Sequence, residues 1–344
     1  MNLETLDYTL DPALVAQEPR PTRDGARLLI VDRGKGARAH AEIRELGQWL
    51  SPGDLLIVND AEVMAARLRG RRPSGGAVEI LLAEEVAGAE GWLCLARNGG
   101  KSRRGERITF GPDLEGTLSG PADGPYRTIR FEAQGDLKAS LRRHGEVPLP
   151  PYIRRPAGPL PEDRERYQTV FARVPGAIAA PTAGLHFTPA LLRELEESGV
   201  RCAAITLLVG VATFLPVRTA SLDAHHVPAE RYNIPASTAA AIAATKAAGG
   251  RVVAVGTTSV RTLESAALDD GTVRPGSGRT QLIIGPGYRF RVVDALLTNL
   301  HLPRSTLLAL VAAFAGVEPT LSAYRVANDA GYRFYSYGDA MLIT

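Results

Sequence analysis

The stretch Ala179-Ala180-Pro181-Thr182-Ala183-Gly184-Leu185-His186-Phe187-Thr188 decides the fold of this chain. Apolar segments on either side of it, residues 176–179 and 200–209, predict buried strands. Thr188 followed by Pro189 is typical of a helix N-cap with proline at the first helical position, and Gly199 provides a stop. The order is therefore strand, polar loop, helix, strand. Free N–H groups where such a loop opens a helix favour an anionic or polar ligand, although a tight connection around a buried histidine is the simpler interpretation of one loop.

A second unit of the same kind gives the first one functional weight. Residues 251–255 predict a buried strand, and Gly256-Thr257-Thr258-Ser259 then opens a helix. Arg261 and Glu264 lie one turn apart in that helix, so we expect them to be close enough to pair.

The remaining α/β elements lie near the two ends of the chain. Residues 10–17 and 40–50 predict helices, and residues 28–31 and 54–60 predict strands. Towards the C-terminus, an apolar segment at 292–298 ends in Asn299-Leu300-His301-Leu302-Pro303, and Ser305 predicts the cap of a helix that Gly316 stops. The aromatic segment 332–342 predicts a packed terminal strand.

The middle of the chain has a different pattern from about Ala66. Short alternating segments at 77–82, 91–96, 107–110 and 126–131 are separated by turn residues, which indicates a small antiparallel barrel or sandwich. A proline-rich return at 149–156 leads back to α/β periodicity. We therefore predict an α/β fold in which a mixed-sheet main domain, residues 1–65 and 148–344, carries an inserted small antiparallel β-barrel domain at residues 66–147.

Composition sets the class of protein. The chain has 344 residues, is 45% hydrophobic and has a net charge of +3, which permits an RNA partner without requiring one. No signal peptide and no apolar run near the ~20 residues of a membrane helix is present, so we expect a soluble, cytoplasmic protein without membrane association. Cys94 and Cys202 are expected to be reduced core thiols. The sequence contains no Walker loop, no GxGxxG, no GxSxG and no metal-ligand spacing, which predicts no metal. The arginines of the insert are equally consistent with a solvated basic face and with nucleic-acid contacts: Arg67, Arg69, Arg71, Arg72, Arg103 and Arg104.

Five motifs together resemble one enzyme family. They are Arg23-Asp24 with Arg27-Leu28-Leu29, then residues 181–187, 255–264, 298–303 and 332–341. In this order they resemble the S-adenosylmethionine:tRNA ribosyltransferase-isomerases of the queuosine pathway, from about Leu10 to the C-terminus. The resemblance implies an α/β domain with an inserted β-barrel, which agrees with the periodicity above.

The resemblance also implies a reaction. S-adenosylmethionine is a substrate and not a methyl donor. Its ribosyl part is transferred to the aminomethyl group of 7-aminomethyl-7-deazaguanine in tRNA and rearranges to give epoxyqueuosine, while adenine and methionine leave. The expected partners are S-adenosylmethionine and tRNA, and we expect a monomer.

The motifs supply candidate site residues for that chemistry. Because the sulfonium acidifies the adjacent C5′ protons, a modest general base suffices. His186 and His301 are the candidate bases, and Asp339 is the third catalytic candidate, to hold an amine or an adenine edge. Thr182, Thr257 and Thr258 are candidates for ribose or carboxylate contacts. The other expected substrate-binding residues are Arg23, Asp24, Gly184, Arg261, Glu264, Asn299 and Tyr337.

Several positions depart from the usual family pattern. A histidine is replaced by Leu208 and a glycine by Ala212, and an arginine is replaced by Glu62. Pro228 stands where a histidine is usual, and Arg304 where an acid follows His-Leu-Pro. Since leucine cannot move a proton, these changes keep two alternatives open. One is a diverged paralogue with a different, small-molecule acceptor, and the other is a non-catalytic nucleoside- or tRNA-binding protein.

Overall fold

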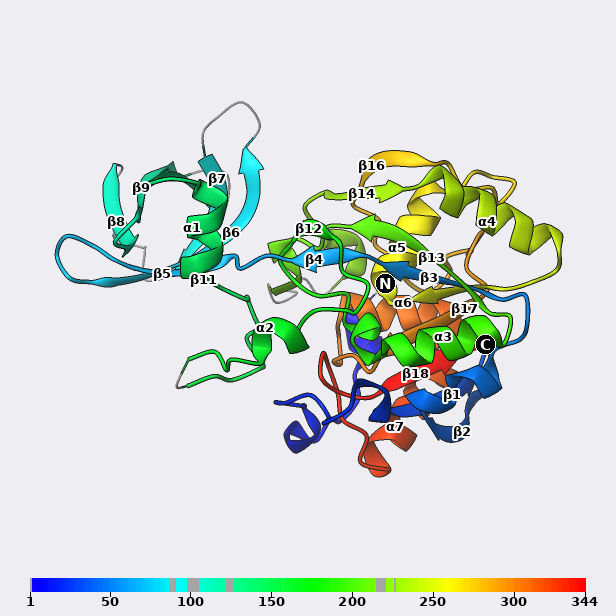
Figure 1. Ribbon diagram of the computed structural model, residues 1–344. Helices are drawn as coiled ribbons and strands as arrows, with labels where there is room; N and C mark the ends of the chain where they lie inside the picture. The colour runs from blue at the N-terminus through cyan, green and yellow to red at the C-terminus, as the bar shows by residue number, and fades with distance from the viewer. Residues whose placement is uncertain are drawn as a thin grey trace.

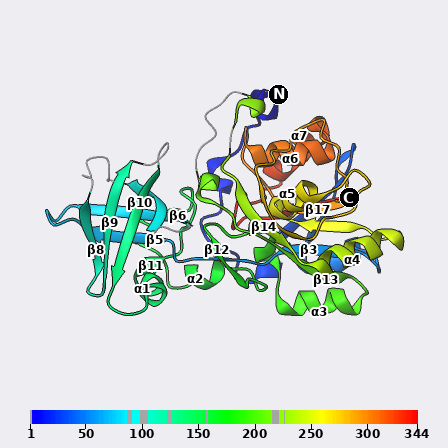
Figure 2. The same ribbon diagram turned by 90° about the horizontal axis from the view of Figure 1, so that it is seen from above.

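The computed structural model describes residues 2–86, 91–97, 105–121, 126–156, 158–214, 221–225 and 227–344. Arg103 and Arg104 lie outside these ranges, and the side chain of Ala212 is not described. The chain forms an α/β body and a β-barrel that lie side by side in both views (Figures 1 and 2). The fold class predicted from the sequence is thus confirmed.

The α/β body is built on a nine-stranded mixed sheet. Its four central strands are parallel, in the order β13 (Arg201–Leu207), β3 (Leu55–Asn59), β15 (Val252–Val255) and β17 (Ala295–Asn299). On one side the sheet continues through β18 (Ala340–Ile343), antiparallel to β17, to β1 (Arg27–Asp32) and β2 (Gly36–Glu42). On the other side it continues through the antiparallel strands β14 (Glu230–Ile234) and β16 (Gly276–Thr280).

Successive side chains along the strands point to opposite faces of the sheet and so belong to two separate hydrophobic cores. On β3, Leu55 and Ile57 belong to one cluster, whereas Leu56 and Val58 belong to the other. The helices α4 (Ala236–Ala247), α5 (Thr257–Ala266), α6 (Thr306–Ala315) and α7 (Val317–Asp329) pack into the first cluster. The helix α3 (Pro189–Glu197) and the 3₁₀ helix η4 (Ile43–Trp49) pack into the second. The result is a three-layer α/β/α body.

The barrel is closed by six antiparallel strands. Their order is β5 (Arg67–Arg71), β6 (Ala77–Val86), β7 (Gly91–Arg97), β10 (Tyr126–Ala133), β9 (Leu114–Pro121) and β8 (Glu106–Gly111), and Arg71 of β5 pairs with Thr109 of β8. The short strand β11 (Gly145–Glu146) extends β5, and α1 (Leu137–His144) precedes it. The barrel has its own core, which includes Ile80, Ile108 and Ile129.

Two short segments join the barrel to the body. The strands β4 (Ala61–Val63) and β12 (Val174–Ala177) form a separate two-stranded parallel sheet, and the short helix α2 (Asp163–Arg166) lies beside them (Figure 1). The segment at 176–179 predicted as a buried strand therefore belongs to this small sheet and not to the main one. Gly176 has φ +135, which bends the strand away from regular pairing.

Three further expectations about elements were wrong. The expected helix at 40–50 is the end of β2 followed by η4, because His40 and Ala41 pair with Leu29 and Leu28 of β1. The expected helix at 10–17 is only the 3₁₀ helix η2 (Pro12–Leu14). In the segment 332–342, the strand β18 begins only at Ala340. Tyr335 has a φ of +72, which is outside the β region, so the chain before β18 is not a continuous strand. The other 3₁₀ helices are η1 (Leu3–Leu6), η3 (Arg23–Gly25), η5 (Thr182–His186), η6 (Val211–Phe214) and η7 (Leu222–Ala224).

Two remaining sequence features can be placed. Cys94 is buried in the barrel core, whereas Cys202 is exposed near the start of β13, so the expectation of a core thiol was wrong for Cys202. Among the described residues, no single helix is long and apolar enough to cross a membrane. In the same part of the chain only α6 and α7 taken together are long and apolar enough, and they are bent by 114°.

Candidate active site

A cavity of about 1090 Å³ lies at the carboxyl ends of β15 and β17. Its walls come from segments that are distant in sequence, among them residues 150–152, 179–183, 256–258, 282–284, 298–307 without Leu300, and 335–336. Ligands of open α/β sheets bind outside the carboxyl ends of the strands, which is where this cavity is found. Arg97, at the end of the barrel strand β7, also lines it, so both parts of the molecule contribute.

The structure brings six of the predicted site residues to the cavity wall: Thr182, Thr257, Thr258, Arg261, Asn299 and His301. The other seven lie outside the lining: Arg23, Asp24, Gly184, His186, Glu264, Tyr337 and Asp339. His186 is one hydrogen bond away, through Asn299.

The N-terminus of α5 forms one wall. Gly256 has φ +86, a conformation that favours glycine, and it turns the chain sharply from β15 into the helix. The first N–H groups of a helix have no intrahelical partner, so those of this turn can bind an anionic or polar group. The Thr258 hydroxyl oxygen is buried beside them and has no hydrogen-bond partner among the described residues.

His301 is the one histidine among the predicted residues whose side chain lines the cavity. Its Nε2 lies 2.9 Å from Oγ1 of Thr298. Its backbone is held by two tyrosines, since its N–H donates to the hydroxyl of Tyr324 and its carbonyl accepts from the hydroxyl of Tyr8. Burial lowers the pKa of His301 from 6.5 to about 3. The ring is therefore neutral at pH 7.

His186 acts on Asn299. The amide nitrogen of Asn299 donates to Nε2 of His186 at 3.2 Å and to the carbonyl of Tyr335 at 2.9 Å. Burial lowers the pKa of His186 to about 4, while Asp339 opposes that shift. The neutral ring thus has its proton on Nδ1, and Nε2 is left as the acceptor that Asn299 needs.

Arg261 pairs with Glu230 and not with Glu264. Nη1 of Arg261 lies 2.5 Å from the Glu230 carboxylate, which also accepts the N–H of Gly210 at 2.8 Å. Nε of Arg261 donates to the carbonyl of Leu282. The predicted pairing with Glu264 was wrong because both side chains find partners outside the helix.

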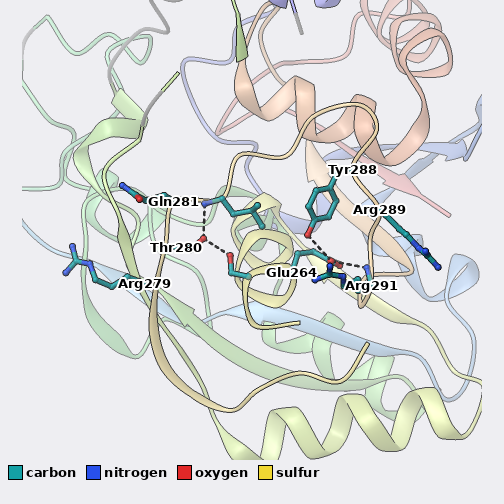
Figure 3. A pocket seen from close by; sticks show the side chains of 9 residues that line it. Glu264, Arg279, Thr280, Gln281, Tyr288, Arg289 and Arg291 are labelled. Carbon is teal, nitrogen blue, oxygen red and sulfur yellow. Dashed lines mark hydrogen bonds between the residues drawn. The ribbon is translucent and has the colours of Figure 1, made fainter. Parts of the chain in front are cut away.

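Glu264 fixes a loop beside a second, shallower hollow of about 540 Å³. Figure 3 shows its carboxylate directed at Tyr288 and at the chain around Arg291. It also accepts the N–H groups of Val292 and Val293, which lead into β17. With these partners Glu264 supports the segment that positions the cavity floor.

Asp339 is fully buried and fully engaged. Its carboxylate binds the guanidinium of Arg20 through hydrogen bonds of 3.0 and 3.1 Å. It also accepts the N–H groups of Arg27 at 2.9 Å and Arg333 at 2.8 Å. The carboxylate thereby ties together the N-terminal segment, β1 and the loop before β18.

The remaining predicted residues support the loop that contains η5. Arg23 donates to the carbonyls of Leu185 and Glu165, and Asp24 accepts a 3.4 Å contact from the hydroxyl of Thr188. Gly184 is packed so closely that a Cβ there would lie 2.7 Å from the ring of Phe171. Tyr337 is buried edge-on against Tyr167.

Sequence reasoning missed several cavity residues. Tyr335 and Tyr152 line the wall, as do Glu230 and Arg97. Tyr335 lies in the family motif 332–341, from which only Tyr337 and Asp339 were chosen, and nothing in the sequence places Tyr152 or Arg97 beside it. Within the described part of the chain, no three His, Cys, Asp or Glu side chains gather as a metal site.

The comparisons with known proteins cover the whole chain. The family model described as queuosine biosynthesis protein matches residues 3–343. This chain belongs to that family. The S-adenosylmethionine:tRNA ribosyltransferase-isomerase of Geobacter metallireducens is 50% identical over 344 residues, covering 100% of both chains. The enzyme of the same name from Anaeromyxobacter dehalogenans is 51% identical over 346 residues, covering 100% of this chain and 99% of its own. A crystal structure of an S-adenosylmethionine tRNA ribosyltransferase from Thermotoga maritima is 37% identical, with a TM-score of 0.57 over 99% of this chain and 100% of that one.

Membership of the queuosine biosynthesis family gives no support to the alternative of a diverged paralogue. The positions that depart from the usual pattern are also scattered in the structure. Arg304 and Pro228 line the cavity, whereas Glu62 lies in β4. Leu208 is not among the lining residues, and its Cδ1 lies 3.0 Å from where a Cβ on Gly176 would be.

Proposed function

We propose that this protein is an S-adenosylmethionine:tRNA ribosyltransferase-isomerase. It transfers the ribosyl moiety of S-adenosylmethionine to the aminomethyl group of 7-aminomethyl-7-deazaguanine in tRNA, with rearrangement to epoxyqueuosine and release of adenine and methionine. The observation that carries this proposal is the cavity that joins a neutral, buried histidine to a helix N-terminus within a chain of this family.

S-adenosylmethionine binds in the cavity at the carboxyl ends of the central strands. The first turn of α5 receives a polar or anionic part of it, either a ribose hydroxyl or the methionine carboxylate. Thr257 and Thr258 lie in that turn, and the hydroxyl of Thr258, which has no partner within the described part of the chain, is available to the ligand. Thr182, in the 3₁₀ helix η5, contributes a further hydroxyl to the cavity wall.

His301 is the proposed general base. The sulfonium of S-adenosylmethionine acidifies the C5′ protons, so the neutral imidazole needs only modest basicity to start the reaction. Thr298 orients the ring through the 2.9 Å contact to Nε2. His186 is a positioning residue, because it acts on the site through Asn299. Asp339 holds the fold of the surrounding segments and takes no part in proton transfer.

The tRNA approaches from the side of the barrel. Arg97 belongs to the barrel strand β7 and lines the cavity, so the opening lies next to the barrel. Two arginines of β5 reach solvent: Arg71 is exposed, and Arg69 has a side chain 51% exposed that pairs with Glu146. Both can contact phosphates.

The test is a product assay with tRNA that contains 7-aminomethyl-7-deazaguanine. The wild-type protein should release adenine and methionine in equal amounts and form no S-adenosylhomocysteine. His301→Gln retains a polar side chain but not the base, and turnover should fall by the roughly 10²–10⁴-fold that a positioned acid–base group contributes. Asp32→Asn, on the exposed pair with Arg38, is the matched control and should turn over like the wild type. Formation of S-adenosylhomocysteine would instead identify a methyltransferase.

A further inference from the structure

Tyr335 adopts a backbone conformation that its residue type avoids. Its φ is +72, in the left-handed region that favours glycine. Three hydrogen bonds hold it there. Its N–H donates to the carbonyl of Leu300 at 3.0 Å, and its carbonyl accepts from Gly338 at 2.9 Å and from the side chain of Asn299 at 2.9 Å. Strain maintained by such surroundings is typical of binding and catalytic sites.

The strained backbone places an aromatic ring on the cavity wall. Tyr335 and Tyr152 both line the cavity, and their ring centroids are 4.0 Å apart at an interplanar angle of 32°. The hydroxyl of Tyr152 is anchored at 2.5 Å to Oγ of Ser336. The hydroxyl of Tyr335 is buried without a partner among the described residues, and burial raises its pKa.

Asn299 adds a buried acceptor to the same wall. Its amide nitrogen uses both hydrogens, on His186 and on the carbonyl of Tyr335. The opposite orientation of the amide would set its oxygen against that carbonyl, so the orientation is fixed. Oδ1 is consequently left buried and without a partner among the described residues, in a residue that is 2% exposed. An unpaired buried acceptor in a cavity is suited to a donor on a ligand.

The geometry points to Tyr335, Tyr152 and Asn299 as the binding subsite for the adenine base of S-adenosylmethionine. The stacked tyrosine pair offers a flat aromatic surface to the purine ring, and Oδ1 of Asn299 accepts a hydrogen bond from the exocyclic amino group. The inference rests on the proposed function, since it assigns one part of that substrate to one wall of the cavity. The same three residues keep their contacts with adenine when it becomes the leaving group.

Depth in the cavity favours adenine over the deazaguanine of tRNA. Both bases are planar and carry donors, so the shared chemistry is that of an aminopurine. Asn299 ends the central strand β17 and is almost fully buried, whereas a base attached to tRNA must enter from the side of the barrel. The freely diffusing substrate can reach the floor before the tRNA arrives.

The experiment measures affinity for S-adenosylhomocysteine, which has the same adenine but does not react. Tyr335→Gly removes the ring while suiting the positive φ, and Tyr335→Phe removes only the hydroxyl. Isothermal titration should show binding weakened roughly 5- to 150-fold in Tyr335→Gly, the loss of one base–aromatic stack, and much less in Tyr335→Phe. Tyr126→Phe in the barrel is the control and should bind as the wild type does. Thermal unfolding of each variant reports on folding separately.

A second arm tests the hydrogen bond. An analogue of S-adenosylhomocysteine with purine in place of adenine lacks the amino group. The wild type should bind this analogue roughly tenfold more weakly than S-adenosylhomocysteine, which is the contribution of one hydrogen bond. Asn299→Ala should bind the analogue and S-adenosylhomocysteine with equal affinity. An equal preference in both proteins would overturn the role of Asn299.

Two outcomes would overturn the subsite as a whole. If Tyr335→Gly leaves S-adenosylhomocysteine binding unchanged, the ring is structural only. If it weakens only the binding of tRNA that contains the deazaguanine, the subsite belongs to the acceptor base. In both cases wild-type turnover would still support the proposed function, which fails separately if the wild type consumes no S-adenosylmethionine.

Discussion

The amide nitrogen of Asn299 lies 3.2 Å from Nε2 of His186, a contact that only the neutral imidazole can accept. Protonation of Nε2 would set two donors against each other in a buried site. Activity and stability are therefore linked to the protonation of His186, although its side chain does not line the cavity.

Stability should fall as the pH decreases from about 7 towards 5. The folded-state pKa is about 4 for His186 and about 3 for His301, below the ordinary value of 6.5. The unfolded state therefore binds more protons in this range, and the free energy of unfolding decreases as the pH falls. Each buried histidine should contribute a loss of about 2 kcal/mol between pH 7 and pH 5. Urea unfolding at both pH values measures it.

Glutamine variants identify the source of that pH dependence. Glutamine does not titrate, so each single variant, His186→Gln or His301→Gln, should lose about 2 kcal/mol less stability than the wild type between pH 7 and pH 5. The double variant should lack the contributions of both histidines. An undiminished loss in the double variant would assign the pH dependence to other groups.

Asp339→Asn should lower the stability of the protein without removing a group that takes part in catalysis. The substitution leaves the charge of Arg20 without its partner beside a fully buried side chain, at a cost of about 3–5 kcal/mol. Urea unfolding should show this loss. Asp32→Asn, which breaks only the exposed pair with Arg38, should cost less than ~1 kcal/mol. The folded Asp339→Asn protein should keep a turnover well above that of His301→Gln. If turnover falls equally in the two variants, Asp339 takes part in catalysis.

Local patterns predicted much of the α/β body. Alternate residues of β3 lie in two different hydrophobic cores, so both faces of the strand are buried. An uninterrupted run of apolar residues, as in β3, predicts a strand buried on both faces. Caps and stops also act locally, so Thr188 with Gly199 and Ser305 with Gly316 located two helices correctly. The expectation failed at 40–50, where apolar spacing compatible with a helix was overridden by pairing of His40 and Ala41 with β1.

The site was harder to predict because it depends on tertiary partners. The spacing of Arg261 and Glu264 says nothing of Glu230 or of the backbone amides that bind Glu264. Motif membership likewise could not separate Asp339, whose oxygens are occupied within the fold, from Asn299, whose oxygen has no partner among the described residues. The left-handed backbone of Tyr335 is fixed by Leu300 and Asn299, which are remote in sequence.

The barrel arginines should contribute to tRNA affinity through phosphate contacts. Arg69 is half-exposed and Arg71 is exposed, so Arg69→Glu/Arg71→Glu should weaken tRNA binding and lower the log–log salt slope by about one for each phosphate that the variant no longer neutralises. Filter binding over a series of salt concentrations measures both. Arg193→Glu/Arg325→Glu, at exposed positions on α3 and α7, changes the net charge by the same amount and is the charge-matched control. If both proteins bind tRNA equally well, the barrel arginines form only a solvated face.

Leu208→His should not raise turnover. A positioned acid–base group is worth ~10²–10⁴-fold, but only within reach of the substrate. Leu208 follows β13, its N–H donates to the carbonyl of Arg231, and its side chain packs near Gly176 and not on the cavity wall. Leu208 is half-buried, so histidine at this position should cost stability within the ~0.5–3 kcal/mol typical of single substitutions, and it would not reach the substrate. Steady-state adenine release with modified tRNA measures the effect, and Leu208→Gln controls for polarity without basicity. A large gain for histidine that glutamine does not share would place this position in the site after all, because only a proton-accepting ring could produce it.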